Sequence, residues 1–159
     1  MTDGDHSDSP TPRQLALNRI SARECSASDV RAYLKRKGVA AEVARETVEE
    51  LVRAGYVDDE RFSRAMLRTQ AARDKGPAYI AAKLAAKGVR RSGSDVRLIF
   101  EETAGVSEEL LIQKVIARRY ADKLGTPENR QRVFQSLLRR GFSPDAIRAA
   151  LRTLESKDR

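Results

Sequence analysis

Few residues of this 159-residue chain could carry out chemistry on a substrate. The one histidine is His6, and the one cysteine is Cys25. No histidine or asparagine can be placed beside Cys25 to activate it, so we expect it to be a small buried residue. The sequence holds no Cys/His set at metal-ligand spacing, no P-loop and no dinucleotide-binding glycine motif. It therefore predicts a protein that is not an enzyme, with no metal and no cofactor.

Carboxylates gather at 58–60, 101–102 and 108–109. The first and third groups stand where helices are expected to begin. Carboxylates there cap free N–H groups and favour the positive end of the helix dipole. We interpret them as helix starts rather than as an acid–base pair or a metal site.

Adjacent basic residues are the remaining candidates, and the chemistry they suit is phosphate binding. Most of them fall in the last turn of an expected helix or just after it. Cations also complement the negative helix end there, so both interpretations remain open. The candidate DNA- or partner-binding residues are Lys35, Arg36, Lys37, Arg90, Arg91, Arg118, Arg119, Arg139 and Arg140.

The charge of the whole chain favours a polyanionic partner. The formal net charge is +8. Basic and acidic residues number 9 and 9 in residues 1–54, 10 and 7 in 55–104, and 12 and 7 in 105–159. The excess of positive charge therefore rises toward the C-terminus. A cationic surface of this size attracts nucleic acid more often than it attracts a membrane face.

Glycines and prolines outline the elements that must position these residues. A hydroxyl residue precedes Pro12, Pro127 and Pro144, which is typical of a helix start. Pro77 follows Gly76 and is expected to open a helix in the same way. Amphipathic runs end at Gly38, Gly55, Gly76, Gly88, Gly105, Gly125 and Gly141, where we expect left-handed C-caps. Together they predict an all-α chain with helices near 12–25, 28–37, 41–54, 59–75, 77–87, 94–104, 107–124, 128–140 and 144–154.

The sequence also repeats itself. The pattern Val30, Leu34, Gly38 recurs as Ile80, Leu84, Gly88 and as Val133, Leu137, Gly141. An apolar residue follows each glycine, and basic residues precede it. The glycines lie 50 and 53 residues apart, which is the length of a three-helix unit. The pattern predicts three tandem three-helix repeats.

The expected organisation is a disordered tail over residues 1–10 followed by repeats over 11–54, 55–105 and 106–159. Three such units in a row form an elongated, curved array. Arrays tolerate loss of a terminal copy, so a fragment ending near Ala104 is expected to fold. No apolar stretch approaches the ~20 residues that span a bilayer. A monomeric, cytoplasmic protein with no membrane contact is expected.

The repeat signatures resemble those of the RecX family, regulators of the RecA recombinase. The most recognisable stretch is Gly55-Tyr56-Val57-Asp58-Asp59-Glu60-Arg61-Phe62-Ser63-Arg64-Ala65, which continues into Lys75-Gly76-Pro77 and Lys87-Gly88-Val89. The third repeat matches through Leu138-Arg139-Arg140-Gly141-Phe142-Ser143, and the first through Ser26, Leu34 and Lys37-Gly38. The resemblance spans about Arg13 to Leu154. Cys25 stands where the family often has histidine, and the link after Gly88 is longer than usual.

The resemblance implies an inhibitor that binds RecA–DNA filaments in their helical groove and modulates recombination, DNA repair and the SOS response. Its partners would be RecA and single- and double-stranded DNA, without sequence preference. The stretch around Asp58 and Asp59 would shape a junction between repeats. Large apolar side chains at such a junction usually bury, so Tyr56 and Phe62 are expected in the core.

Other interpretations remain open at this point. A three-helix unit is also typical of a helix-turn-helix transcription regulator, which would bind a discrete operator. A helical scaffold without nucleic acid is the third hypothesis. The sequence leaves open whether the protein inhibits or assists RecA, and whether it lies in the groove or at filament ends.

Overall fold

The structure is a computed structural model that describes residues 9–157. The tail predicted for residues 1–10 therefore lies outside the described residues, except for Ser9 and Pro10. Within 9–157 every regular element is helical, with nine α-helices, one short 3₁₀ helix and no strand. The all-α prediction is confirmed.

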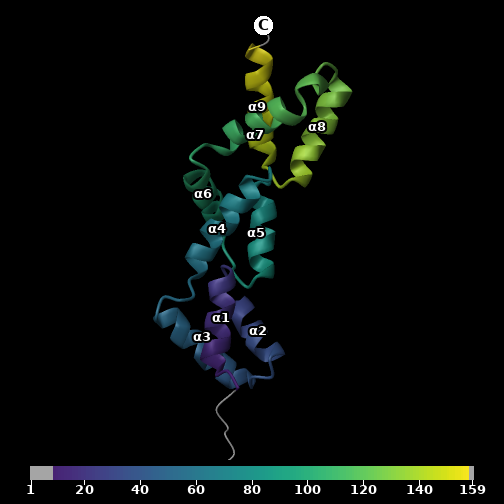
Figure 1. Ribbon diagram of the computed structural model, residues 1–159. Coiled ribbons are helices and arrows are strands. Elements are labelled where there is room, and N and C mark those ends of the chain that lie inside the picture. Colours follow the sequence, from purple (N-terminus) through teal and green to yellow (C-terminus); the bar gives the residue numbers. More distant parts are fainter. Residues whose placement is uncertain (1–8, 158–159) are drawn as a thin grey trace, which may run out of the picture. The chain divides into compact units, whose positions relative to one another are not determined.

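The helices follow one another through short links (Figure 1). All nine α-helices begin within one residue of the predicted start: five at it, three one residue earlier, and the helix near 107 one residue later. Predicted helices 59–75 and 107–124 end early, at Ala71 and Arg119. The elements are α1 Pro12–Ala22, α2 Ala27–Arg36, α3 Ala41–Arg53, α4 Asp59–Ala71, α5 Pro77–Ala86, α6 Gly93–Ala104, α7 Glu108–Arg119, η1 Ala121–Lys123, α8 Pro127–Arg139 and α9 Pro144–Lys157.

Hydroxyl side chains cap the helix starts as expected. The Thr11 hydroxyl accepts the N–H of Gln14 at 3.2 Å, with Pro12 as the first residue of α1. The Thr126 hydroxyl accepts the N–H of Asn129 at 3.3 Å at the start of α8. These local bonds replace intrahelical partners that the first turn lacks, which is why the sequence pattern locates them well.

Five of the seven glycines predicted as left-handed caps have a positive φ: Gly38, Gly55, Gly88, Gly105 and Gly141. The prediction is wrong for Gly76 and Gly125. The chain leaves α4 through Asp74 instead, a non-glycine residue with φ of 60°. Gly76 has a different reason to be glycine, because a Cβ there would lie 2.5 Å from the backbone of Gly141.

The contacts divide the chain into two compact units, each described by itself below. Unit 1 comprises residues up to Phe62 together with Lys87–Val89. Its helices α1, α2 and α3 pack against one another (Figure 1). The core between them consists of Ala16, Cys25, Val30, Leu34, Ala44, Val48, Leu51 and Val57.

Unit 2 comprises residues 63–86 and those from Arg90 onward. In it α5 packs against α6, α7 against α9, and α8 against α9. The residues of the repeat pattern fill the cores of both units: Val30 and Leu34 in unit 1, and Ile80, Leu84, Val133 and Leu137 in unit 2 are all buried.

The burial of the family-like stretch is only partly as predicted. Phe62 is buried, but Tyr56 is 47% exposed, so its placement in the core is wrong. Tyr56 instead lies under the guanidinium of Arg13, 5.9 Å from the ring centroid. In α4 the buried side chains are Phe62, Ser63, Leu67 and Gln70.

Candidate nucleic-acid interface

The predicted basic residues lie where the sequence places them, at helix ends. Lys35 and Arg36 are in the last turn of α2, Arg118 and Arg119 in the last turn of α7, and Arg139 in the last turn of α8. Lys37 and Arg140 are the C-cap residues of α2 and α8. Arg90 and Arg91 lie in the link before α6.

In unit 1 a cation from α1 and one from the end of α2 lie near the Tyr33 ring. The Lys37 ammonium lies 5.7 Å from the Tyr33 ring centroid, and the Arg19 guanidinium lies 5.2 Å from it. Both distances allow cation–π attraction. Lys35 and Arg36 are exposed. Three neighbouring cations at one helix end suit an anionic ligand.

In unit 2 the two arginines at the end of α7 bind one carboxylate. Asp74, in the turn after α4, has a side chain only 2% exposed and forms ion pairs with Arg118 and Arg119. The Arg119 Nε lies 2.5 Å from Asp74 Oδ2. Burial alone would raise the pKa of Asp74, but hydrogen bonds from Arg119 and Arg118 and their charges outweigh it and hold the pKa below its usual value. The side chains of Arg118 and Arg119 stay 60% and 47% exposed. They are oriented by Asp74 yet remain open to solvent.

Tyr120 links Arg140, at the end of α8, to the arginines at the end of α7. Its hydroxyl is 2.8 Å from that of Ser136 on α8. Burial alone would raise the pKa of Tyr120, but hydrogen bonds with Ser136 and Arg140 and the charges of Arg140 and Arg119 lower it below its usual value. The end of α8 therefore joins the end of α7 in one electropositive region.

Lys75, in the link before α5, and Lys83, within α5, extend this region. The ammonium of Lys75 lies 4.5 Å from the Tyr79 ring centroid, and that of Lys83 lies 5.4 Å from it. The Gly76 N–H donates to the Arg140 carbonyl at 2.8 Å, which holds the start of α5 beside the end of α8. We call Lys75, Lys83, Arg118, Arg119 and Arg140 the unit 2 cluster. Two of these five cations, Arg118 and Arg119, are paired with the Asp74 carboxylate.

Sequence reasoning found three members of the unit 2 cluster and missed Lys75 and Lys83, together with Asp74, Tyr79 and Tyr120. Lys75, Tyr79 and Lys83 are four residues apart, so helical spacing would have placed them on one face. Asp74 is 44 residues from Arg118. No local pattern signals that pairing.

The acidic groups have structural roles. The Asp58 carboxylate accepts the N–H groups of Glu60 at 2.8 Å and Arg61 at 3.1 Å, as a helix start requires. Glu108 is 1% exposed and reaches the start of α9, where it accepts the Ser143 N–H at 2.7 Å and the Ser143 hydroxyl at 3.0 Å. Glu108 thus ties α7 to α9 rather than only capping its own helix. Among the described residues, no group of three or more side chains of the metal-binding types comes together.

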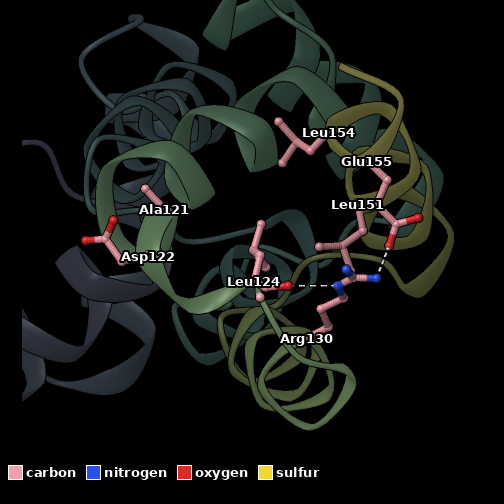
Figure 2. Close-up of a pocket in the computed structure, with 8 residues that line it drawn as sticks. Ala121, Asp122, Leu124, Arg130, Leu151, Leu154 and Glu155 are labelled. Atoms are coloured by element: carbon pink, nitrogen blue, oxygen red, sulfur yellow. Dashed lines mark hydrogen bonds and ion pairs between the residues drawn. The ribbon is translucent and has the colours of Figure 1, made fainter. Parts of the chain in front are cut away.

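A hollow of about 530 Å³ opens beside η1, α8 and α9 (Figure 2). Leu124, Leu151 and Leu154 give it an apolar floor. Arg130 spans its edge, with Nε 2.8 Å from the Leu124 carbonyl and Nη1 2.7 Å from Glu155 (Figure 2). The lining side chains include no Ser, Thr, Cys or His.

Asp74→Asn is expected to lower the free energy of unfolding by about 1–3 kcal/mol at pH 7, because the charged hydrogen bonds are lost. Asn also tolerates positive φ, so the turn should keep its shape. The folded pKa of Asp74 lies below its unfolded value, so its contribution is present above pH ~4 and disappears as pH falls through the folded pKa. Denaturant titrations from pH 7 to pH 3 should show the two proteins converging. A constant difference across that range would contradict the ion pairs.

Within residues 9–157 no helix has the length and apolar character that crossing a bilayer requires.

Comparison with known proteins follows the three helical groups along the chain. The first, second and third three-helix domains of RecX match residues 13–51, 58–92 and 108–151. The regulatory protein RecX of Xanthomonas citri is 31% identical over 143 residues, covering 89% of this chain and 86% of that protein. The RecX protein of Streptococcus pneumoniae strain CGSP14 is 25% identical over 146 residues, covering 91% of this chain and 56% of that protein.

Solved structures share the fold. The crystal structure of RecX from Lactobacillus salivarius superposes with a TM-score of 0.69 at 23% identity, covering 91% of this chain and 94% of that one. A second crystal structure, of a regulatory protein RecX, gives a TM-score of 0.62 at 24% identity over 87% and 72% of the two chains. With three RecX domains in order and a relative above 30% identity along nearly its whole length, the chain belongs to the RecX family of regulatory proteins.

Proposed function

We propose that this protein inhibits the RecA recombinase by binding the RecA–DNA filament in its helical groove. In doing so it modulates recombination, DNA repair and the SOS response in the cytoplasm. It acts as a monomer of three repeats over residues 11–54, 55–105 and 106–159, and it has its own sequence-tolerant affinity for DNA. Membership of a family of regulatory proteins supports the regulatory part of this proposal.

The unit 2 cluster is the observation that carries the DNA-binding part. Four separate segments contribute its cations, and Asp74 fixes the direction of two guanidinium groups. Pre-oriented arginines lose less conformational entropy when they bind phosphate. A cluster without base-reading side chains in a recognition helix suits a backbone contact, which is insensitive to sequence.

The direct test is a titration of the protein into RecA strand-exchange and ATPase assays. Falling rates support inhibition, and rising rates would show that the protein assists RecA instead. Unchanged rates at saturating protein would rule out a RecA regulator. On free DNA, a discrete footprint at one sequence would instead support the helix-turn-helix regulator.

Charge reversal separates phosphate contact from helix-dipole complementation. Arg139 is an exposed cation in the last turn of α8, next to Arg140 of the unit 2 cluster. We expect Arg139→Glu to weaken DNA binding and to reduce the salt slope by ~0.7–0.9 log unit if one contact is lost. Fluorescence anisotropy with labelled DNA at several salt concentrations measures both.

Arg53→Glu is the matched control. Arg53 is exposed in the last turn of α3 and is not one of the predicted binding residues, and its reversal changes the net charge and the helix-end charge in the same way. Its DNA affinity should stay near that of the unaltered protein. Equal losses in Arg139→Glu and Arg53→Glu would mean that Arg139 acts only through net charge or the helix end.

A further inference from the structure

At two places in the fold, the first residues of one helix pack against the glycine that follows the end of another helix. In unit 1 the Ser26 hydroxyl donates to the Lys87 carbonyl at 2.8 Å, and the Lys87 ammonium lies 3.1 Å from the Asp29 carboxylate. Gly88 closes against Ser28, where a Cβ would lie 2.6 Å from the serine Cβ. The start of α2 is thus seated on the residues that follow α5.

In unit 2 the same arrangement joins α5 and α8. The Gly76 N–H donates to the Arg140 carbonyl at 2.8 Å, and the Ala78 N–H donates to the Gly141 carbonyl at 3.0 Å. A Cβ on Gly141 would overlap the backbone nitrogen of Tyr79. Here too the first turn of one helix is seated on the glycine end of another.

We call each of these helix-start to helix-end contacts a joint, and the two joints involve equivalent positions of the repeat. Ser26 and Gly76 each stand four residues before the first apolar residue of the pattern, and Lys87 and Arg140 each directly precede its glycine. In both joints this pre-glycine carbonyl accepts a hydrogen bond from the other helix start. In both joints, therefore, a helix end with a basic residue before its glycine accepts a hydrogen bond from the start of another helix.

The end of α2 has the same features but receives nothing within the described chain. Gly38 has φ of 85°, like Gly88 and Gly141, yet no atom lies within 4 Å of a Cβ placed on it. The Lys37 carbonyl stands at the position of the Lys87 and Arg140 carbonyls that accept hydrogen bonds in the two joints. Lys35, Arg36 and Lys37 are all exposed.

We propose that this Lys37–Gly38 end is a protein-docking surface, and that it receives the acidic first turn of a helix on the protein component of the filament. This rests on the proposed function, which supplies that partner. Both contacts show the chemistry for the Lys37 carbonyl, which is an N–H or hydroxyl donor, and the unit 1 contact adds a carboxylate, Asp29, for a lysine. A DNA phosphate carries no donor for a carbonyl oxygen, so the geometry favours a protein over nucleic acid at this end.

Gly38→Asn tests the surface without disturbing the interior. Asn adopts positive φ more readily than other side chains, and its atoms would project into the open space that a docked helix needs. Gly55→Asn is the matched control, because Gly55 ends α3 with φ of 76° and has nothing within 4 Å of its Cβ position. The two substitutions should lower the thermal midpoint by similar amounts.

The measurement is the affinity of each variant for RecA filaments assembled on labelled DNA, beside its affinity for the same DNA free. Gly38→Asn should lose about tenfold in filament affinity, as expected for a lost hydrogen-bonded charged contact, while Gly55→Asn changes it less than about twofold. Free-DNA affinity should be the same in both variants.

Three results would overturn the proposal in different ways. If the unaltered protein binds filaments no better than free DNA, the proposed function fails and the docking surface fails with it. If the unaltered protein binds filaments and Gly38→Asn binds like Gly55→Asn, the docking surface alone is wrong. If Gly38→Asn loses free-DNA and filament affinity equally, the α2 end binds nucleic acid rather than protein.

Discussion

Gly141→Ala is expected to destabilise unit 2 by about 3 kcal/mol or more, through left-handed strain together with the loss of buried hydrogen bonds. Gly141 has φ of 88°, where an L side chain is strained. The added methyl would also overlap the backbone nitrogen of Tyr79 and lie 2.6 Å from its Cβ. Because backbone cannot rotate away as a flexible side chain can, α5 and α8 must move apart.

Moving them apart breaks the bonds that close this joint. The donors are the Gly76 and Ala78 N–H groups, and the acceptors are the Arg140 and Gly141 carbonyls. Thermal unfolding followed by circular dichroism should show a drop in midpoint of several degrees. Gly93→Ala is the matched control, since Gly93 begins α6 with no positive φ and open space around its Cβ position. A midpoint for Gly141→Ala equal to that of Gly93→Ala would mean that the joint yields without cost.

Local chemistry explains how much of the fold the sequence could predict. Thr11 and Thr126 cap the residues three positions later, so a pattern of four residues contains both partners. The repeat pattern likewise predicts the buried side chains of α2, α5 and α8, because four-residue spacing places them on one helix face. These features need no knowledge of the rest of the chain.

Gly76 shows where local reasoning fails. A glycine after an amphipathic run predicts a left-handed cap, yet Asp74 takes the left-handed conformation and Gly76 meets the backbone of Gly141. The reason for the glycine lies 65 residues away in the chain. Tyr56 fails for a related reason: its bulk suggests burial, but its ring packs with Arg13 at the surface instead.

In the candidate site, too, local features were predictable from the sequence and long-range contacts were not. Helix ends correctly locate Arg118, Arg119 and Arg140, because cations are favoured there by the dipole. Their assembly into one cluster depends on Asp74, Tyr120 and the Gly76–Arg140 bond, which connect segments far apart in sequence. Residue type and position were therefore predictable, whereas the partners of each residue were not.

A fragment ending at Ala104 is expected to lose at least about tenfold of the inhibition of RecA strand exchange, because avidity from linked contacts can reach 10²–10⁴. The sequence alone predicts that such a fragment folds, but the joint changes that expectation. The cut removes Arg118 and Arg119, leaving the buried Asp74 carboxylate unpaired. It also removes the carbonyl groups of Arg140 and Gly141 that hold the start of α5. We expect α1–α3 to remain folded and α4–α6 to unfold.

Asp74→Asn in the same fragment separates the two causes of unfolding, which are the unpaired Asp74 carboxylate and the loss of the Arg140 and Gly141 carbonyls. An uncompensated buried carboxylate is costly, whereas a buried amide is less so, and the substitution should restore part of the helix content of α4–α6. Circular dichroism and gel filtration measure helix content and monomeric behaviour before any inhibition assay. Cooperative melting of all six helices without the substitution would show that repeats fold independently of the joint. If that folded fragment also inhibited strand exchange as well as the full chain, contact with successive filament protomers would not be the source of inhibition.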